Sequence, residues 1–167
     1  MGYYNICNGT TGIATGLASS IPQFNLTEVN EAMIKLLWNR DTDFEEIYCP
    51  PDFCTGGTIL NASKVKELLK VGCGGSVKMR STAEYDEKTN SVIFTEIPYG
   101  VHVGTIMNQI EEKINKGELL GIDRVLDQST STSKLKIELE KNTNPSRIIK
   151  QLFKLTSLED SFTINMV

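Results

Sequence analysis

Long apolar runs are absent from this sequence. No stretch of its 167 residues approaches the roughly 20 consecutive apolar residues that a membrane-spanning helix requires. The amino-terminal residues also lack the charged and then apolar pattern of a secretory signal peptide. We therefore expect a soluble, cytoplasmic protein that does not act on membranes.

Metal- and nucleotide-binding patterns are equally scarce. The four cysteines, Cys7, Cys49, Cys54 and Cys73, show no Cys-x-x-Cys spacing, and His102 is the single histidine. This pattern favours free thiols in a reducing compartment over a zinc site. The sequence contains neither a Gly-x-x-x-x-Gly-Lys-Ser/Thr loop for phosphates nor clustered aspartates for a metal ion. We expect the chain itself to bind no cofactor, and His102 to be a surface or capping residue, with a DNA contact as the alternative.

An excess of basic residues is also missing. The net charge is −4, from 17 basic and 21 acidic residues, whereas a nucleic-acid-binding domain is usually basic. Any contact with DNA must therefore come from local basic groups. The sequence has three such groups: Lys78 with Arg80, Lys66 with Lys70, and Arg147 with Lys150 and Lys154. Each group is also what an ordinary solvated face contains.

Apolar periodicity predicts both helices and strands. The helices are expected over residues 26–38, 63–71, 103–116 and 145–155. The strands are expected over residues 58–60, 76–85, 91–97, 122–126, 134–139 and 162–166. A turn at residues 86–90 joins two of these strands into a hairpin. Strands and helices without βαβ repetition indicate an α+β fold, a mixed or antiparallel sheet with packed helices, in one domain over residues 1–167.

A glycine-rich segment near the amino end carries most of the functional information. Residues 8–16 read Asn-Gly-Thr-Thr-Gly-Ile-Ala-Thr-Gly, and their three glycines allow a tight loop that approaches another molecule closely. Ile13 is the one large apolar side chain in this segment. Taken alone, such a residue is more often buried under a loop than presented to a partner.

Four segments, in order along the chain, resemble motifs of one protein family. Residues 8–14 resemble Asn-Gly-Ser-Ser-Gly-Ile-Ala, residues 51–57 resemble Pro-Asp-Phe-Pro-Thr-Gly-Gly, residues 96–99 match Glu-Ile-Pro-Tyr, and residues 161–166 resemble Ser-Phe-Gly-Ile-Asn-Met. These motifs belong to the A, or breakage-reunion, subunit of bacterial type IIA DNA topoisomerases, which are DNA gyrase and topoisomerase IV. Each motif alone is weakly diagnostic, but their common order makes coincidence improbable.

The resemblance implies a fold and a role. The chain is similar to the tower region of that subunit, which is the lobe beside the winged-helix DNA gate, with residues 1–22 as a DNA-facing loop region. We therefore expect a fragment of a longer A subunit, which binds and bends double-stranded DNA as part of a supercoiling, relaxing or decatenating enzyme. In the family the isoleucine of the first motif is wedged between base pairs, a role that falls here on Ile13.

The same resemblance assigns further residues and partners. Asn8, Thr10 and Thr11 are placed to hydrogen-bond phosphates, and Lys78 with Arg80 is the preferred basic pair, since Arg80 matches the first arginine of the family's Met-Arg-Ala-Arg-Ala-Glu strand. The second arginine is Thr82 here, which weakens the patch. The implied partners are DNA, the topoisomerase B subunit, which holds Mg²⁺ and ATP, and a second A subunit in a homodimer.

The family's cleaving tyrosine is not in this sequence. None of the five tyrosines follows an arginine as the family's nucleophile does, so the isolated chain is expected to be inactive. Two other interpretations remain at this point. One is a structural spacer lobe without DNA affinity, and the other is a small enzyme that uses Asp52 or Glu96 as its acid or base.

Overall fold

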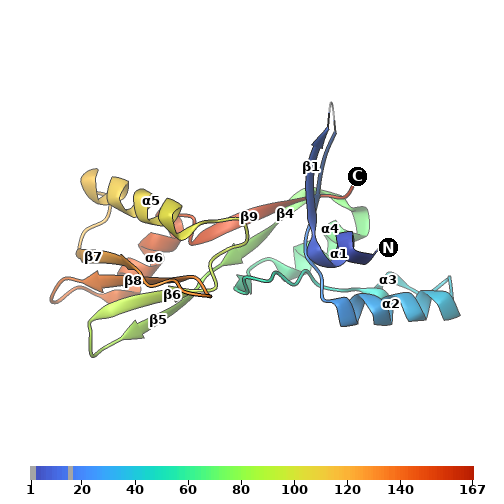
Figure 1. Ribbon diagram of the computed structural model, residues 1–167, viewed down its shortest axis with the longest axis horizontal. Coiled ribbons are helices and arrows are strands. Elements are labelled where there is room, and N and C mark those ends of the chain that lie inside the picture. Colours follow the sequence, from blue (N-terminus) through green and yellow to red (C-terminus); the bar gives the residue numbers. More distant parts are fainter. Residues whose placement is uncertain (1–2, 15–16) are drawn as a thin grey trace. The chain divides into compact units, whose positions relative to one another are not determined.

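The computed structural model describes residues 3–14 and 17–167 and divides the chain into two compact units. The first unit comprises Met1–Cys54, Ile59–Lys78 and Ser161–Val167, and the second comprises Thr55–Thr58 and Met79–Asp160. The assignment of residues 1–167 to one tower-like domain stays a prediction. The elements are helices and antiparallel strand pairs, which confirms the α+β fold class (Figure 1).

The first unit holds four helices of the described chain and most of one sheet. These elements are α1 (Tyr3–Asn8), β1 (Thr10–Ala14), β2 (Leu17–Ile21), α2 (Leu26–Trp38), α3 (Phe44–Ile47) and α4 (Ala62–Val71). Three further strands pass from one unit to the other along the chain: β3 (Thr58–Ile59), β4 (Cys73–Arg80) and β9 (Glu159–Asn165). The strand order in this five-stranded sheet is β1-β2-β9-β4-β3.

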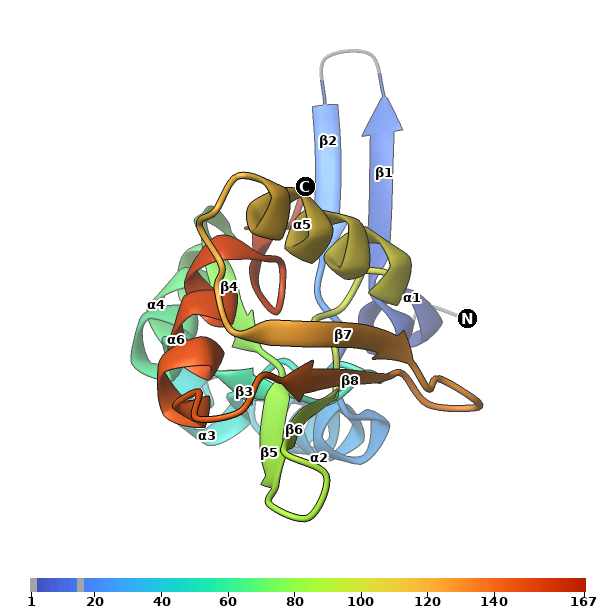
Figure 2. The ribbon, with the colours of Figure 1, turned by 90° about the vertical axis from the view of Figure 1, so that its left-hand side faces the viewer.

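The second unit is a four-stranded antiparallel sheet with two helices. Its elements are β5 (Thr82–Asp86), β6 (Ser91–Thr95), α5 (Val103–Asn115), β7 (Ile122–Asp127), β8 (Lys134–Leu139) and α6 (Pro145–Leu155). The strand order is β5-β6-β8-β7, and each neighbouring pair is antiparallel. Figure 2 shows this sheet together with α5 and α6.

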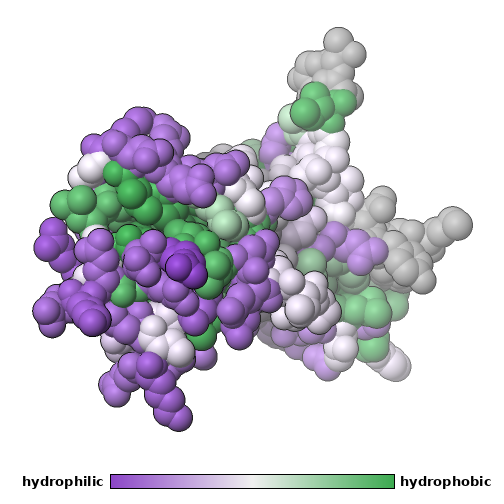
Figure 3. Space-filling view, turned by 60° about the vertical axis from the view of Figure 1, so that its left-hand side comes forward, coloured by the Kyte–Doolittle hydropathy of each residue, from purple (hydrophilic) through white to green (hydrophobic). Residues whose placement is uncertain are grey.

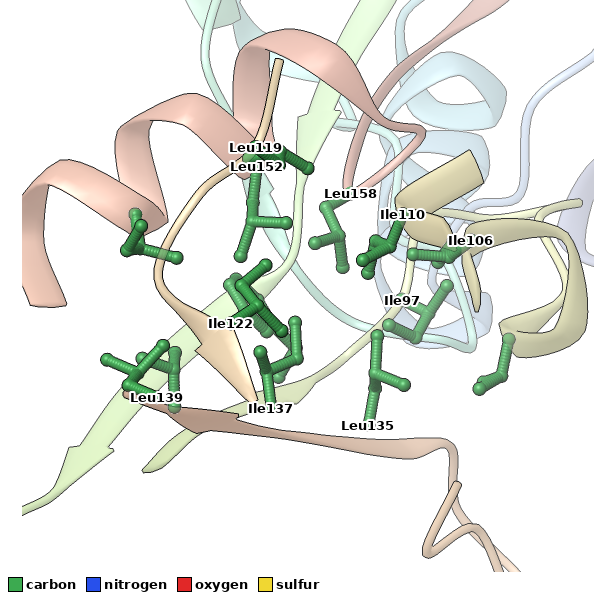
Figure 4. Packing of buried hydrophobic residues seen from close by; sticks show 14 residues of the cluster. Ile97, Ile106, Ile110, Leu119, Ile122, Leu135, Ile137, Leu139, Leu152 and Leu158 are labelled. Atoms are coloured by element: carbon green, nitrogen blue, oxygen red, sulfur yellow. The ribbon is translucent and has the colours of Figure 1, made fainter. Parts of the chain in front are cut away.

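Strand alternation places the core of the second unit on one face of its sheet. Val92 pairs with Ile137 and Phe94 with Leu135, and all four side chains are fully buried. Because successive strand residues point to opposite faces, the intervening Ile93 lies on the other face, opposite Lys136. The core is completed by buried residues of α5 and α6: Ile106, Ile110, Ile148 and Leu152. Figure 4 labels Ile106, Ile110 and Leu152 among them.

Local contacts explain where several of the helices begin and end. The side chain of Asn25 caps α2 by accepting from the Thr27 amide, and Asn144 caps α6 by accepting from the Ser146 amide. Gly72 ends α4 in the left-handed conformation that favours glycine. Three elements have the bounds that the sequence predicts: helices 26–38 and 145–155 and strand 134–139.

One predicted strand is wrong in its extent. The alternation over residues 76–85 predicts a single strand, but the structure has β4 ending at Arg80 and β5 starting at Thr82, in different sheets. Between them, the backbone amide and hydroxyl of buried Ser81 both donate to the Leu158 carbonyl, at 2.9 and 3.0 Å. The alternation of apolar and polar residues continues through Ser81. The local pattern therefore could not reveal that β4 and β5 belong to different sheets.

The structure also contains elements that the sequence did not predict. Thr10–Ala14, expected as a loop, is strand β1 and pairs with β2, while α1 and α3 were not predicted at all. The predicted apolar face of α2 is only partly covered, since Val29 is buried but Leu37 and Trp38 are 80% and 87% exposed. Thr15 and Gly16, the end of the glycine-rich segment, lie outside the described residues.

The described residues offer neither a membrane-spanning helix nor a metal cluster. No helix in this part of the chain is long and apolar enough to span a bilayer. Residues 3–14 and 17–167 also contain no cluster of metal-ligating side chains. All four cysteines are free thiols, and burial raises the pKa of the Cys49 thiol.

Candidate nucleic-acid interface

The β1–β2 hairpin presents an apolar side chain to solvent. Its strands pair antiparallel from Thr10 with Ile21 to Ala14 with Leu17, and Ile13 lies opposite Ala18. Ile13 is 95% exposed, the largest value among the exposed large hydrophobic residues of the described chain. The hairpin extends away from the helices of the first unit, and hydrophobic surface is visible at its described end (Figures 1 and 3). Burial of Ile13, the interpretation that composition alone favours, is therefore wrong.

The base of the hairpin is held by one glutamine. The side-chain amide nitrogen of Gln23 donates to the Asn8 carbonyl at 3.0 Å, and its oxygen accepts from the Cys54 amide at 2.9 Å. The backbone carbonyl of Gln23 also accepts from the Asp52 amide at 2.8 Å. Gln23 thus joins the start of the first motif to the second motif, residues 51–57.

Gly9 connects α1 to the β1–β2 hairpin. Its φ is +70°, and an added Cβ would lie 2.9 Å from the Ile21 carbonyl oxygen. We expect Gly9→Ala to destabilise the attachment of the hairpin by about 1–3 kcal/mol, because both the dihedral angle and the close approach require glycine. Faster hydrogen exchange of the β1 and β2 amides would report this effect.

Gly12 provides the matched control for that substitution. It lies in the same hairpin without a positive φ and has nothing within 4 Å of an added Cβ. Gly12→Ala should leave amide exchange in the hairpin near the wild-type rates. Equal exchange in both variants would contradict the role assigned to Gly9.

The polar residues predicted to contact phosphates lie along the same hairpin. Asn8 is the last residue of α1, and Thr10 and Thr11 are the first two residues of β1. All three are exposed, and Thr11 pairs with Ser20 on the neighbouring strand. Hydroxyl and amide side chains of this kind donate readily to phosphate oxygens. The structure therefore places Asn8, Thr10 and Thr11 in the same hairpin region as Ile13.

The predicted basic pair is divided by the structure. Lys78 is exposed on β4 and belongs to the first unit, where its backbone amide donates to the Asn61 side chain. Arg80 belongs to the second unit, and its Nε and Nη2 donate to the same Glu159 oxygen at 2.9 and 2.6 Å. The Arg80 guanidinium also lies 4.7 Å from the ring centroid of Phe153. Its charge is thus engaged within the protein.

The remaining motifs bind one another rather than forming an open site. Glu96, in a left-handed backbone conformation with φ 53°, accepts from the Thr82 hydroxyl at 2.5 Å and from the Gly57 amide at 3.3 Å. Phe53 packs edge-on against Phe162, with ring centroids 5.5 Å apart. The Glu-Ile-Pro-Tyr motif therefore secures the glycines of the second motif, and the second motif packs on the fourth.

Three of the groups that could serve as acid, base or nucleophile, Asp52, Glu96 and Tyr85, make hydrogen bonds within the protein. The Asp52 carboxylate accepts a hydrogen bond from the Asn25 side-chain amide at 3.2 Å. Glu96 is held by its own bonds to Thr82 and Gly57. Burial raises the pKa of the Tyr48 phenol, while nearby Lys66 acts in the opposite direction. Tyr85 donates to the Asn90 side chain at 2.9 Å. His102 is exposed at the N-cap of α5 and makes no side-chain capping bond.

The fold and the hairpin define the class of protein: an α+β chain that presents polar groups and one apolar side chain on an exposed β-hairpin. A sequence model of the DNA gyrase/topoisomerase IV A subunit family matches residues 4–167. The chain belongs to this family. The match covers all four motifs recognised in the sequence.

Relatives support the same assignment. The chain is 36% identical over 171 residues to the DNA gyrase A subunit of Neisseria gonorrhoeae, and 35% identical over 175 residues to that of Mycolicibacterium smegmatis. It is 36% identical over 169 residues to the DNA gyrase A subunit of Metamycoplasma arthritidis. Each match covers 97% of this chain but only 19% or 20% of the relative. The chain thus spans about a fifth of the length of these relatives.

The sequence did not reveal which side chains contact Arg80. Glu159 and Phe153 are 79 and 73 positions away along the chain, and no motif or spacing connects them with β4. A charge count treats Arg80 and Lys78 alike, because both are basic residues on one strand. Only the tertiary contacts distinguish the engaged cation from the exposed one.

Proposed function

We propose that this chain is the DNA-binding and DNA-bending part of a type IIA topoisomerase A subunit, of the DNA gyrase or topoisomerase IV kind. The observation that carries the proposal is the 95% exposure of Ile13 on a hairpin whose base is secured by Gln23. An apolar side chain in that position has no folding role to fulfil. It is available to enter a base step of a duplex.

The physical chemistry of a wedge explains the bending. Inserting an apolar side chain between base pairs costs a few kcal/mol of unstacking, which the additional contacts to the bent duplex offset. Thr10, Thr11 and Asn8 supply donors beside the wedge, and such contacts position the duplex without reading its sequence. Binding by this surface is accordingly expected to depend little on base sequence.

The wider assembly follows from the same proposal. The nucleophilic tyrosine and the Mg²⁺ and ATP sites lie outside this chain, with Mg²⁺ and ATP held by a B subunit. The working enzyme contains two A subunits and acts on double-stranded DNA in the cytoplasm. The 167-residue chain alone binds and bends DNA without cutting it.

Binding to a short fluorescent duplex tests the proposal. Anisotropy titrations at several salt concentrations should show binding at low salt that weakens steeply as salt rises, because phosphate contacts release condensed counterions. A chain that folds but shows no binding at the lowest salt would instead be a spacer lobe. The net charge of −4 disfavours binding to DNA and is the observation that supports the spacer interpretation.

Neutralising each member of the predicted basic pair separately gives a sharper result. Lys78→Gln should reduce the slope of log affinity against log salt by about 0.9, the value for one lost phosphate contact on duplex DNA. Arg80→Gln should leave the slope nearly unchanged and lower the free energy of unfolding by about 1–2 kcal/mol, through its contacts with Glu159 and Phe153. The opposite assignment of the two effects would show that Arg80, not Lys78, contacts the phosphates.

A further inference from the structure

Helix α6 has two chemically opposite faces. Ile148 and Leu152 are buried in the core of the second unit, at 1% and 0% exposure. Arg147, Lys150 and Lys154 are exposed at helical spacing on another side of the helix. Since positions three and four residues apart share a helix face, these three cations form one row, here called the α6 basic row.

The three cations of the α6 basic row take part in none of the ion pairs of the described residues. Within residues 3–14 and 17–167, ion pairs engage five cations: Lys66 with Glu45, Arg80 with Glu159, Lys113 with Glu118, Lys116 with Glu112 and Lys136 with Glu138. None of the ion pairs in the described part of the chain involves Arg147, Lys150 or Lys154. Their charges are available to an anionic partner.

The row lines a hollow whose lining residues are all polar or basic, although the surface that they expose there is largely that of their aliphatic stems. Its volume is about 460 Å³, and its lining residues are Asn144, Ser146, Arg147, Lys150, Gln151 and Lys154. Among the described residues, neither a carboxylate nor an apolar side chain contributes to this lining. Phosphate oxygens accept hydrogen bonds from cationic, hydroxyl and amide side chains, which are the groups that these lining residues carry. The positive charge of the lining therefore suits the phosphate backbone of a nucleic acid.

Backbone geometry supports recognition by side chains. At a rise of about 1.5 Å per residue, the row from Arg147 to Lys154 spans about 10 Å along the helix axis. Neighbouring phosphates of one DNA strand are farther apart in space than their rise of about 3.4 Å along the duplex axis, because the strand also winds around the axis, so about two of them fall within that span. The Ser146 and Arg147 amides already donate to Asn144, and Pro145 has no amide hydrogen. The side chains, not the helix terminus, make the site.

We propose that the α6 basic row is a second phosphate-binding surface for duplex DNA, separate from the β1–β2 hairpin. The inference rests on the proposed DNA-binding function and adds a contact that the hairpin does not provide. The row binds the sugar-phosphate backbone through charge and side-chain donors. It thereby holds a duplex without contacting its bases.

The test compares two triple variants of the full 167-residue chain. Arg147→Gln with Lys150→Gln and Lys154→Gln removes the row, while Lys113→Gln with Lys116→Gln and Lys136→Gln removes three cations that are ion-paired in the same unit. Both variants change the net charge equally, so long-range electrostatics are matched. The row variant should lower the salt slope by about 2–3, and the control variant by less than about 1.

The outcomes separate this inference from the proposed function. Duplex binding by the wild-type chain with equal slopes for both triple variants would overturn the α6 inference alone. Failure of the wild-type chain to bind duplex at low salt would overturn both. Retained duplex binding by the row variant, together with loss of binding to polyglutamate, would identify an acidic protein segment as the partner and overturn the inference. Single substitutions, each expected to lower the slope by about 0.9, keep the test decisive if the triple variant does not fold.

Discussion

Replacing Ile13 with alanine is expected to abolish most of the bend that this chain introduces into duplex DNA. The substitution removes the only part of the side chain that can enter a base step and leaves the hairpin backbone intact. Energy transfer between dyes at the two ends of a short duplex measures the bend directly. Efficiency should rise on adding the wild-type chain and stay near the free-duplex value with Ile13→Ala.

The same substitution should leave folding unaffected. Because Ile13 is 95% exposed, its truncation creates no cavity, and the free energy of unfolding should change by no more than about 0.5 kcal/mol. The affinity for duplex DNA is expected to fall by about tenfold or less. The variant loses the additional contacts to the bent duplex, but it also avoids the cost of unstacking a base step. Bending, rather than affinity, is therefore the quantity that reports the wedge.

Leu120 offers a matched control for this experiment. It is also a large, exposed apolar residue, at 69% exposure, but it lies in the second unit, between α5 and β7. Leu120→Ala should bend the duplex as the wild-type chain does. An unchanged bend with Ile13→Ala would remove Ile13 from its proposed role, even if duplex binding itself were confirmed.

Phe94→Ala is expected to lower the free energy of unfolding by about 3–5 kcal/mol, the usual cost of truncating a buried aromatic side chain. Phe94 is fully buried on β6, and its ring meets the Phe153 ring edge-on, with centroids 5.7 Å apart. Truncation leaves a cavity between the sheet and α6 and removes this aromatic contact. Chemical denaturation followed by circular dichroism measures the loss.

Ile93 is the control for the core prediction. It is the neighbouring residue on β6, only partly buried, and it faces away from the core of the second unit. Ile93→Ala should cost about 1 kcal/mol, because partly exposed side chains lose less on truncation. Similar losses for Ile93→Ala and Phe94→Ala would contradict the assignment of the sheet faces.

Much of the fold could be predicted because its signals are local. Asn25 and Asn144 cap helices through contacts with amides two residues away, and α6 has the predicted bounds because Pro145 suits a first helical turn. The hairpin of β5 and β6 follows from its alternation and its turn. Four short motifs identified the family, and the match over residues 4–167 confirms it.

The errors arose where distant residues decide the outcome. Ser81 divides one alternating segment between two sheets through bonds to Leu158, a residue 77 positions away. Strand β1 exists because β2 pairs with it, although its own composition of threonine and glycine resembles a loop. Local propensity is a weak guide for a strand whose stability depends on its partner.

The candidate site shows the same division. The sequence by itself determined the family, the chemical character of the hairpin residues and the positions of the three basic groups, since these depend only on residue identity and spacing. The tertiary structure alone decided that Ile13 is exposed, that Glu159 and Phe153 engage Arg80, and that the described ion pairs leave out the α6 basic row. Exposure and charge pairing depend on which distant side chains come within a few ångströms, and that is a property of the folded chain.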